Sequence, residues 1–247
     1  MTTIPWIPPS APPSDFPPVE AALQSPNGLL AAGGDLSVGR LLYAYQKGIF
    51  PWYNPGEPIL WWSPDPRAIL YPHAIHVSRS LRRELKRSGA TLRADSAFEH
   101  TVHACAAPRE AQSGTWITEE MQAAYGRLHR RGFAHSVEVW LDQELIGGIY
   151  GVALNKIFFG ESMFSRRPNA SKIALVALCA QLMRWGYHFI DAQVSSPHLL
   201  RMGAVEIPRW RFLQQLEQAN DGRPNPTRWQ LDDDLGEATN LAQWKAN

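Results

Sequence analysis

The chain has 247 residues, of which 45% are hydrophobic and 19% charged, and its formal net charge at pH 7 is +1. This composition supplies a sizeable apolar core and excludes general disorder, and the near-neutral balance excludes a polycation that binds nucleic acid through its overall charge. Its two cysteines, Cys105 and Cys179, are too few for a disulfide framework or a four-cysteine zinc site, and they fit a reducing compartment.

The first residues and the apolar segments favour a soluble cytoplasmic protein. The start, MTTIPWIPPS, has neither the basic region nor the apolar region of a signal peptide. The most apolar stretch, residues 173–183, is too short to span a bilayer.

The N-terminal part is rich in proline and aromatic residues. Seven of the 20 prolines fall within the first 18 residues and predict an extended arm. A short helical stretch over residues 19–24 and a loop over residues 25–37 are expected next. Ser37 as N-cap and Gly48 as C′ glycine bracket a predicted helix over residues 38–47. Residues 49–67 hold five prolines and are expected to form an irregular aromatic segment, with Trp61 or Trp62 in the core.

The remaining chain alternates between helical and strand patterns. Helices are predicted over residues 78–87 after Ser78, over residues 98–106, and over residues 119–131 after Thr118. Three meandering strands are then predicted, followed by an apolar helix and a returning buried strand, over residues 135–141, 144–154, 157–164, 171–185 and 187–194. This order is typical of an α+β fold with a mainly antiparallel sheet. The acidic DDDLGE near the C-terminus is expected to be a solvated face or tail.

Familiar catalytic signatures are missing from the sequence. It contains no GxxxxGK[ST], HExxH, CxxC or GxSxG pattern. His100, His103 and Cys105 are close in sequence, but they lie in a helical pattern and nothing nearby supplies a second pair of ligands. We therefore expect no metal site.

Basic residues gather in one segment. Within fifteen residues the chain has one acid, Glu84, and six cations, namely Arg79, Arg82, Arg83, Lys86, Arg87 and Arg93. Such a run forms either a solvated helix face or a contact with a nucleic-acid backbone, and this run alone favours neither. The aromatic segment before it offers rings on which bases stack, at ~1–3 kcal/mol each.

Three polar side chains interrupt apolar strands. Asp191 and Gln193 are two residues apart in FIDAQV, so we expect them to project from one face of the strand, and Glu161 lies in FFGESMFS. An acid in an apolar strand is costly to bury without partners. Either such an acid bonds to a neighbouring loop, or it orients an amide whose oxygen holds an attacking amine. If both acids face one pocket, they suit a cationic substrate.

Nine short blocks follow one another between Gly28 and Leu213, namely GLLAAGGDLS, AYQKGIFPWY, ILWWSPDPRAIL, GTWIT, HSVEVW, GGIYG, FFGESMFSRRPNASK, IDAQ and HLLRMGA. Several of them, such as WWSPDPR and GESMFS, are unusual strings. Together they resemble the leucyl/phenylalanyl-tRNA–protein transferase family. The proline-rich arm and the C-terminal segment lie outside the resemblance.

The resemblance implies an enzyme that moves Leu or Phe, and less well Met, from aminoacyl-tRNA to the α-amino group of proteins beginning with Arg or Lys. This transfer marks the acceptor for degradation by the bacterial N-end rule. The implied fold is a small N-terminal domain with the proline-rich arm over residues 1–65, followed by an N-acetyltransferase-like domain over residues 66–247. Leu-tRNA and Phe-tRNA are the implied donors, and a cytoplasmic monomer without membrane contact is expected.

The acetyltransferases of that superfamily carry a glycine-rich pyrophosphate loop before the helix that follows the meander. This chain has SRRPNAS in that place, without a glycine. Coenzyme A is therefore disfavoured, and no cofactor is expected.

The resemblance also assigns roles to individual residues. Asp191 and Gln193 match the family's proposed catalytic pair, with Glu161 as a third catalytic candidate. Trp52 and Trp116 match residues that hold the 3′-terminal adenosine of the tRNA, with Tyr125 and Glu161 beside them. The tRNA-contacting surface corresponds to Arg79, Arg82, Arg83, Lys86 and Arg87. The pocket for the transferred amino acid is implied to be lined by Ile149, Phe158, Met163, Leu175, Leu178 and Ile190.

An aminoacyl ester is already activated, so its aminolysis requires neither ATP nor a metal, and holding ester and amine together supplies ~7–11 kcal/mol. We hypothesise that Gln193, oriented by Asp191, accepts a hydrogen bond from the attacking amine. Alternatively, Asp191 or Glu161 binds the cationic side chain of the acceptor. Two other classes of protein stay open, a small-molecule acetyltransferase that uses coenzyme A and a non-catalytic RNA-binding protein.

Overall fold

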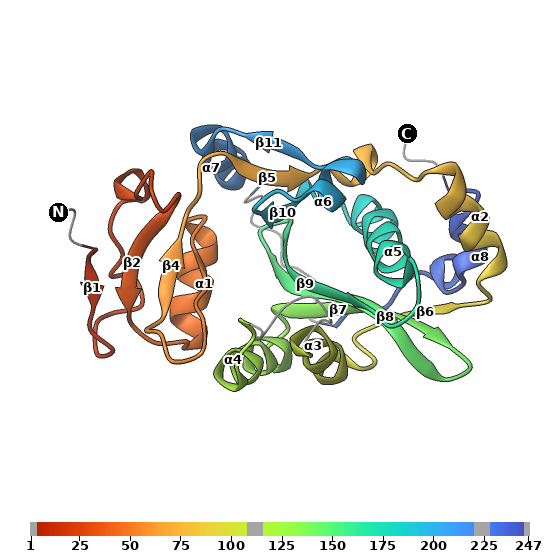
Figure 1. The fold of residues 1–247 in the computed structure, drawn as a ribbon, viewed down its shortest axis with the longest axis horizontal. Coiled ribbons are helices and arrows are strands. Elements are labelled where there is room, and N and C mark those ends of the chain that lie inside the picture. The colour runs from red at the N-terminus through yellow and green to blue at the C-terminus, as the bar shows by residue number, and fades with distance from the viewer. Residues whose placement is uncertain (1–3, 108–115, 220–227, 245–247) are drawn as a thin grey trace.

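A computed structural model of the chain describes residues 4–107, 116–219 and 228–244. The chain forms two sheets (Figure 1). The small sheet has the strand order β1-β2-β4-β3, and its strands are β1 (Trp6–Ile7), β2 (Leu29–Gly33), β3 (Phe50–Pro51) and β4 (Leu60–Trp62).

The large sheet has seven strands in the order β11-β5-β10-β9-β8-β7-β6. Its strands are β5 (Arg67–Leu70), β6 (Thr91–Ala94), β7 (Ala134–Leu141), β8 (Glu144–Leu154), β9 (Ile157–Ser165), β10 (Phe189–Gln193) and β11 (Val205–Ile207). All neighbours in it are antiparallel except β9 and β10, which are parallel and joined by a crossover helix. The predicted meander, helix and returning strand, and with them the α+β class, are therefore confirmed.

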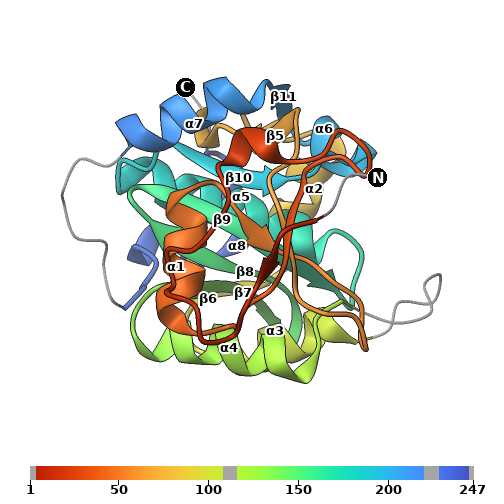
Figure 2. The same ribbon diagram turned by 90° about the vertical axis from the view of Figure 1, so that its left-hand side faces the viewer.

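The helices cover both faces of the large sheet. They are α1 (Val38–Gln46), α2 (Arg79–Arg87), α3 (Phe98–Ala106), α4 (Glu119–Arg130), α5 (Ala170–Arg184), α6 (Pro197–Arg201), α7 (Arg209–Gln218) and α8 (Ala238–Leu241), with 3-10 turns η1 (Val19–Ala21), η2 (Pro72–Ala74) and η3 (Asp233–Leu235). Helices α3 and α4 pack against one face, and α5 packs against the other. Figure 2, viewed from the side of the small sheet, shows α1 in front of the large sheet, with α7 above it and α3 and α4 below.

The predicted helix starts have the expected physical cause. The hydroxyl oxygens of Ser37, Ser78 and Thr118 accept hydrogen bonds from backbone N–H groups in the first turns of α1, α2 and α4. Each cap satisfies one of the amide donors that a helix start leaves without a partner. In the described part of the chain, no helix combines the length and the apolar character needed to cross a membrane.

The small sheet corrects two predictions. Residues 29–33 form a fully buried strand inside the segment expected to be a loop, and β3 and β4 lie inside the segment expected to be irregular. The run LLAAG becomes a strand because β4 pairs with one edge and the extended arm, at Trp6 and Ile7, pairs with the other. Trp61 is fully buried, as expected, and its indole N–H donates to the carbonyl of Gly33 at 2.9 Å.

The small and large sheets share one apolar core. Leu41 and Tyr45 of α1 belong to the same cluster of buried residues as Phe98, Tyr125 and Phe159. Contacts of this kind place α1 against the large sheet. A domain boundary at residue 65 stays a prediction.

The acidic segment near the C-terminus is not a free tail. Asp232 and Asp234 form ion pairs with Arg184 of α5 at 2.7 and 2.6 Å, and Leu235 is buried. Asp232, Asp233 and Asp234 are exposed, which confirms the prediction of a solvated face, but the segment also packs on α5 as it leads into α8.

Candidate active site

The large sheet opens between β9 and β10. These strands pair only as far as Asp191 opposite Phe159. Beyond that point each strand has one extra residue, Glu161 in β9 relative to β8 and Ala192 in β10 relative to β5. Bulges break the ladder and redirect side chains, so the two strands separate here and both ends become available for a site.

Glu161 occupies this opening and accepts three hydrogen bonds. Its Oε1 accepts from the Tyr45 hydroxyl at 2.7 Å and from Nε2 of Gln193 at 3.1 Å. Its Oε2 accepts from the Tyr125 hydroxyl at 2.5 Å. Side chains from α1, α4, β9 and β10 thus meet at one carboxylate, which fixes the amide of Gln193.

Burial controls the protonation of this cluster. Desolvation, opposed by the hydrogen bonds from Tyr125 and Tyr45, raises the pKa of Glu161 to about 7. Burial, and after it the Glu161 carboxylate, raises the pKa of both tyrosines well above the usual value, so both hydroxyls keep their protons and donate. A carboxylate that titrates near neutral pH is typical of functional sites.

Asp191 lies in β10 opposite Ile69 of β5, just before the extra residue Ala192. It is fully buried, and Arg67 of β5 donates to it twice, from Nε at 2.8 Å and from Nη2 at 2.7 Å. Arg67 is itself fully buried between the rings of Phe50 and Phe212. The pair is bidentate, the geometry in which an arginine–carboxylate contact is strongest.

The expectation that Asp191 and Gln193 share one face of the strand was wrong. Asp191 pairs with Ile69 but Gln193 pairs with Ala68, because the extra residue Ala192 shifts the register by one. Gln193 also has φ 62°, in the left-handed region. Asp191 therefore holds the backbone N–H of Gln193, at 2.9 Å from Oδ1, whereas Glu161 holds its side-chain amide.

A cavity of about 1030 Å³ extends from this opening. Six residues predicted for the site line it, namely Ile149, Glu161, Met163, Leu175, Ile190 and Gln193. Phe158 and Leu178 do not line it, although they were predicted for the pocket. Phe158 is buried against Trp229, and Leu178 is fully buried in the core between α5 and the sheet. The cavity thus has an apolar wall formed by Ile149, Met163, Leu175 and Ile190 and a polar end at Glu161 and Gln193. Other polar side chains, among them Arg166 and His198, also line it.

The predicted adenosine-binding tryptophans lie around the small sheet and the start of α4. Trp52 is 45% exposed and its ring lies 5.7 Å from that of Trp62. Trp116 is half-buried and packs against the core that also holds Tyr125. Gly114 and Thr115 of the block GTWIT lie outside the described residues.

The basic helix α2 presents most of its cations to solvent. Arg79, Arg83, Lys86 and Arg87 are exposed. Arg82 differs from them, because its Nη1 donates to the carbonyls of Ala242 and Trp244 at 3.2 and 3.0 Å. Arg82 thus links the C-terminal segment to α2 and is less available to a nucleic acid than the other cations of this helix.

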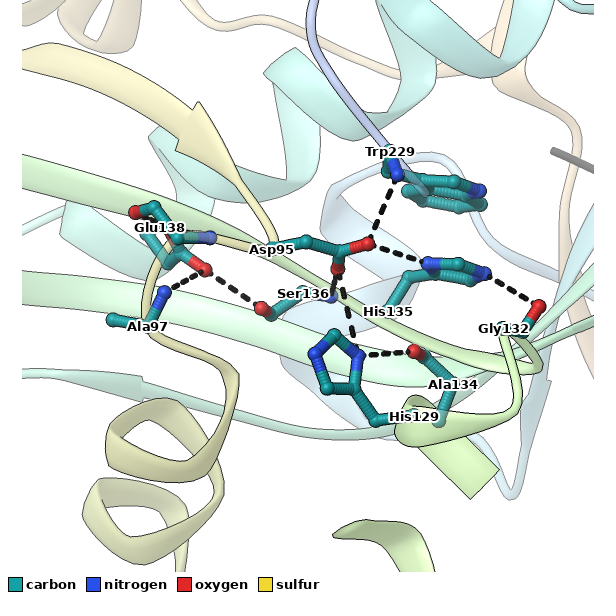
Figure 3. A network of polar contacts seen from close by, with 10 residues as sticks. Asp95, Ala97, His129, Gly132, Ala134, His135, Ser136, Glu138 and Trp229 are labelled. Carbon is teal, nitrogen blue, oxygen red and sulfur yellow. Dashed lines mark hydrogen bonds and ion pairs between the residues drawn. The ribbon is translucent and has the colours of Figure 1, made fainter. Parts of the chain in front are cut away.

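One group of side chains in the described part of the chain has the composition of a metal site. Asp95, His129 and His135 bring their ligand atoms within 4.8 Å of one another (Figure 3). However, Asp95 already accepts from His135 at 2.7 Å and from the backbone N–H of Trp229 at 3.0 Å, and Nδ1 of His129 lies 2.8 Å from the carbonyl of Ala134. We interpret the group as a structural network that fastens the C-terminal segment to β7.

Comparison with known proteins shows which family the chain belongs to. A family model described as leucyl/phenylalanyl-tRNA protein transferase matches residues 69–217, and the model of that family's N-terminal domain matches residues 34–65. The chain belongs to this family. It is therefore an aminoacyltransferase, with aminoacyl-tRNA as donor and a protein as acceptor.

Curated relatives match over nearly their whole length. A leucyl/phenylalanyl-tRNA–protein transferase from Nitrosomonas eutropha is 59% identical over 217 residues, which cover 88% of this chain and 93% of the relative. One from Alkalilimnicola ehrlichii is 57% identical over 231 residues, or 93% of this chain and 90% of the relative. Among solved structures, a GCN5-related N-acetyltransferase from Kribbella flavida matches with a TM-score of 0.37 and 11% identity over 66% of this chain and 58% of its own.

Two members of the site, Arg67 and Tyr45, were not predicted from the sequence. Arg67 had a weak signal, because an arginine at the start of the apolar strand β5 raises the same question of a buried partner as Asp191 does. Tyr45 had none, since it fits the apolar face of α1 beside Leu41 and Ala44 as an ordinary core residue.

Proposed function

We propose that the chain transfers Leu or Phe, and less well Met, from aminoacyl-tRNA to the α-amino group of proteins that begin with Arg or Lys. The observation that carries this proposal is the cavity, in which an apolar wall adjoins the polar end formed by Glu161 and Gln193. The wall suits an uncharged, bulky side chain, because a buried polar group would lack partners there. The polar end is where the ester carbonyl and the amine would meet.

Gln193 is the residue proposed to hold the attacking amine. Nε2 of Gln193 donates a hydrogen bond to Glu161, and the amide oxygen of Gln193 therefore remains available to accept one from the amine. The amine attacks the ester carbonyl carbon, the new C–N bond forms as the C–O bond to the terminal ribose breaks, and the amine proton leaves with the ribose oxygen. The α-amino group has a reference pKa of ~8, so a useful fraction is neutral near pH 7 and positioning dominates the barrier.

Asp191 is proposed to position Gln193 and not to contact substrate. Both of its carboxylate oxygens are occupied by Arg67, and one also holds the backbone of Gln193. Trp52, Trp116 and Tyr125 remain the residues proposed near the terminal adenosine, and α2 remains the proposed tRNA contact. We further propose that the protein acts as a cytoplasmic monomer and marks its acceptors for N-end rule degradation.

Transfer of radiolabelled leucine from Leu-tRNA to a protein beginning with Arg tests the proposed function. We expect incorporation that disappears when the tRNA is treated with RNase, and that is much weaker for an otherwise identical acceptor beginning with Ser. Phe-tRNA should serve as a second donor. Folded protein that incorporates neither amino acid would contradict the proposal, and acetyl transfer from coenzyme A without tRNA would favour the acetyltransferase alternative.

A further inference from the structure

An acceptor that begins with Arg or Lys needs an acid for its side chain near Gln193, whose amide is proposed to hold the α-amine. The two acids predicted for this role, Asp191 and Glu161, already have partners within the protein. Asp191 is fully buried and paired with Arg67. Glu161 is buried and accepts from two tyrosines and from Gln193. A guanidinium or ammonium group could displace these partners only by leaving a buried charge or hydroxyl unpaired.

Glu206 is an exposed acid on the edge strand β11, close to Gln193 across the sheet. Gln193 and Glu206 both lie opposite Ala68, one on each side of β5. Strands in a sheet are ~4.8 Å apart, so the backbones of these two residues are about 10 Å apart. Paired residues point to the same face, which is the face of the cavity because Leu70, two residues along β5 from Ala68, lines it.

This spacing fits one basic amino acid. The side chain of Lys or Arg has five or six bonds between Cα and its charged nitrogen, each ~1.5 Å long, and the extended zigzag chain spans about 6–7 Å. An α-amine on the amide oxygen of Gln193 thus leaves the charged end within reach of the Glu206 carboxylate. Val194, which is 49% exposed, lies in the chain between Gln193 and Ser195 and offers an apolar surface for the methylene stem.

The carboxylate of Glu206 is held in place and not neutralised. The Ser195 hydroxyl donates to its Oε1 at 2.5 Å. Within the described residues, no Lys, Arg or His forms an ion pair with it. One oxygen is therefore oriented by the protein, and the second can accept from a cation.

We propose that Glu206 binds the basic side chain of the acceptor's N-terminal residue and so determines the preference for Arg and Lys. This inference rests on the proposed function. It assigns specificity to an exposed edge of the sheet beyond the cavity that holds the donor's amino acid.

The test compares three acceptor peptides that differ only in the first residue, which is Arg, Lys or the uncharged norleucine, with Leu-tRNA as donor. Glu206→Gln should raise KM for the Arg and Lys peptides about two- to fivefold, the scale expected for one partly solvated ion pair. Neither kcat nor the KM of the norleucine peptide should change. Glu206→Lys should raise KM for the basic peptides more than about tenfold, because it adds repulsion. Salt should reduce the wild-type preference for Arg over norleucine.

Glu144→Gln is the control, since Glu144 is also an exposed glutamate, 71% exposed, but lies at the start of β8, where it forms a long ion pair with Arg167 at 3.9 Å. It should leave all three KM values unchanged. An unchanged preference for Arg over norleucine in Glu206→Gln would overturn the inference while transfer by the wild type still supports the proposed function. Absence of transfer by the wild type would contradict the proposed function itself.

Discussion

Replacing Arg67 with methionine is expected to lower the free energy of unfolding by about 3–5 kcal/mol, because it leaves the buried Asp191 carboxylate without its cation. Both side chains are fully buried, and Arg67 also donates from Nη1 to the carbonyl of Gly48 at 3.0 Å. One substitution therefore removes the link between β5, β10 and the end of α1. Urea unfolding followed by circular dichroism measures the change.

A double variant separates the buried charge from lost packing. Arg67→Met combined with Asp191→Asn should be less destabilised than the single Arg67 variant, since no unpaired charge remains. Arg184→Met is the control for an exposed pair. Although Arg184 contacts both Asp232 and Asp234, its side chain is 36% exposed, and we expect a loss of at most about 1 kcal/mol. If Arg67→Met and Arg184→Met lowered the free energy of unfolding equally, the explanation that burial makes the Arg67–Asp191 pair critical would be contradicted.

Replacing Glu161 with glutamine is expected to lower kcat about 10- to 100-fold at pH 8 and to change the pH profile. The ionised carboxylate holds the amide of Gln193, and a glutamine there presents a donor to groups that are themselves donors. Since the pKa of Glu161 is raised to about 7, wild-type turnover should fall as the pH drops through that value. The variant should retain only the dependence that comes from the acceptor amine, with its reference pKa of ~8.

The stability of the same variant gives an independent check. The native state of the wild type holds the Glu161 proton more tightly than the unfolded chain does, because the pKa rises from 4.5 to about 7 on folding. The wild type should therefore lose stability as the pH rises from about 4.5 to about 7, by up to about 3 kcal/mol. Glu161→Gln lacks this loss, so its stability relative to the wild type should improve between pH 5 and pH 8. A constant difference across that range would show that Glu161 does not titrate there.

Much of the fold was predictable because local signals agreed with it. The caps at Ser37, Ser78 and Thr118 and the alternating strands of the meander reflect short-range chemistry that a sequence displays directly. The strand over residues 29–33 was not predictable in this way. Its run LLAAG is short and flanked by glycines, and its pairing partners lie more than twenty residues away on both sides.

The sequence predicted which residues belong to the site better than it predicted how their side chains are arranged. Glu161, Asp191 and Gln193 stand out as polar residues in apolar strands, and the resemblance to the family supported them. The extra residues at Glu161 and Ala192 leave no local signal, yet they decide which face each side chain occupies. For this reason the sequence suggested that Asp191 orients the amide of Gln193, whereas Glu161 holds it in the structure.

Single-turnover transfer of leucine from Leu-tRNA to a peptide beginning with Arg, with Gln193→Ala beside the wild type, tests the central proposal most directly. The amide oxygen of Gln193 is proposed to hold the attacking amine, so at saturating acceptor the variant should be slower by about 10- to 100-fold. Its affinity for Leu-tRNA should stay within about twofold of the wild type, because the amide is not proposed to bind the donor. A transfer rate equal to that of the wild type would contradict the proposed role of Gln193 and place the amine elsewhere in the cavity.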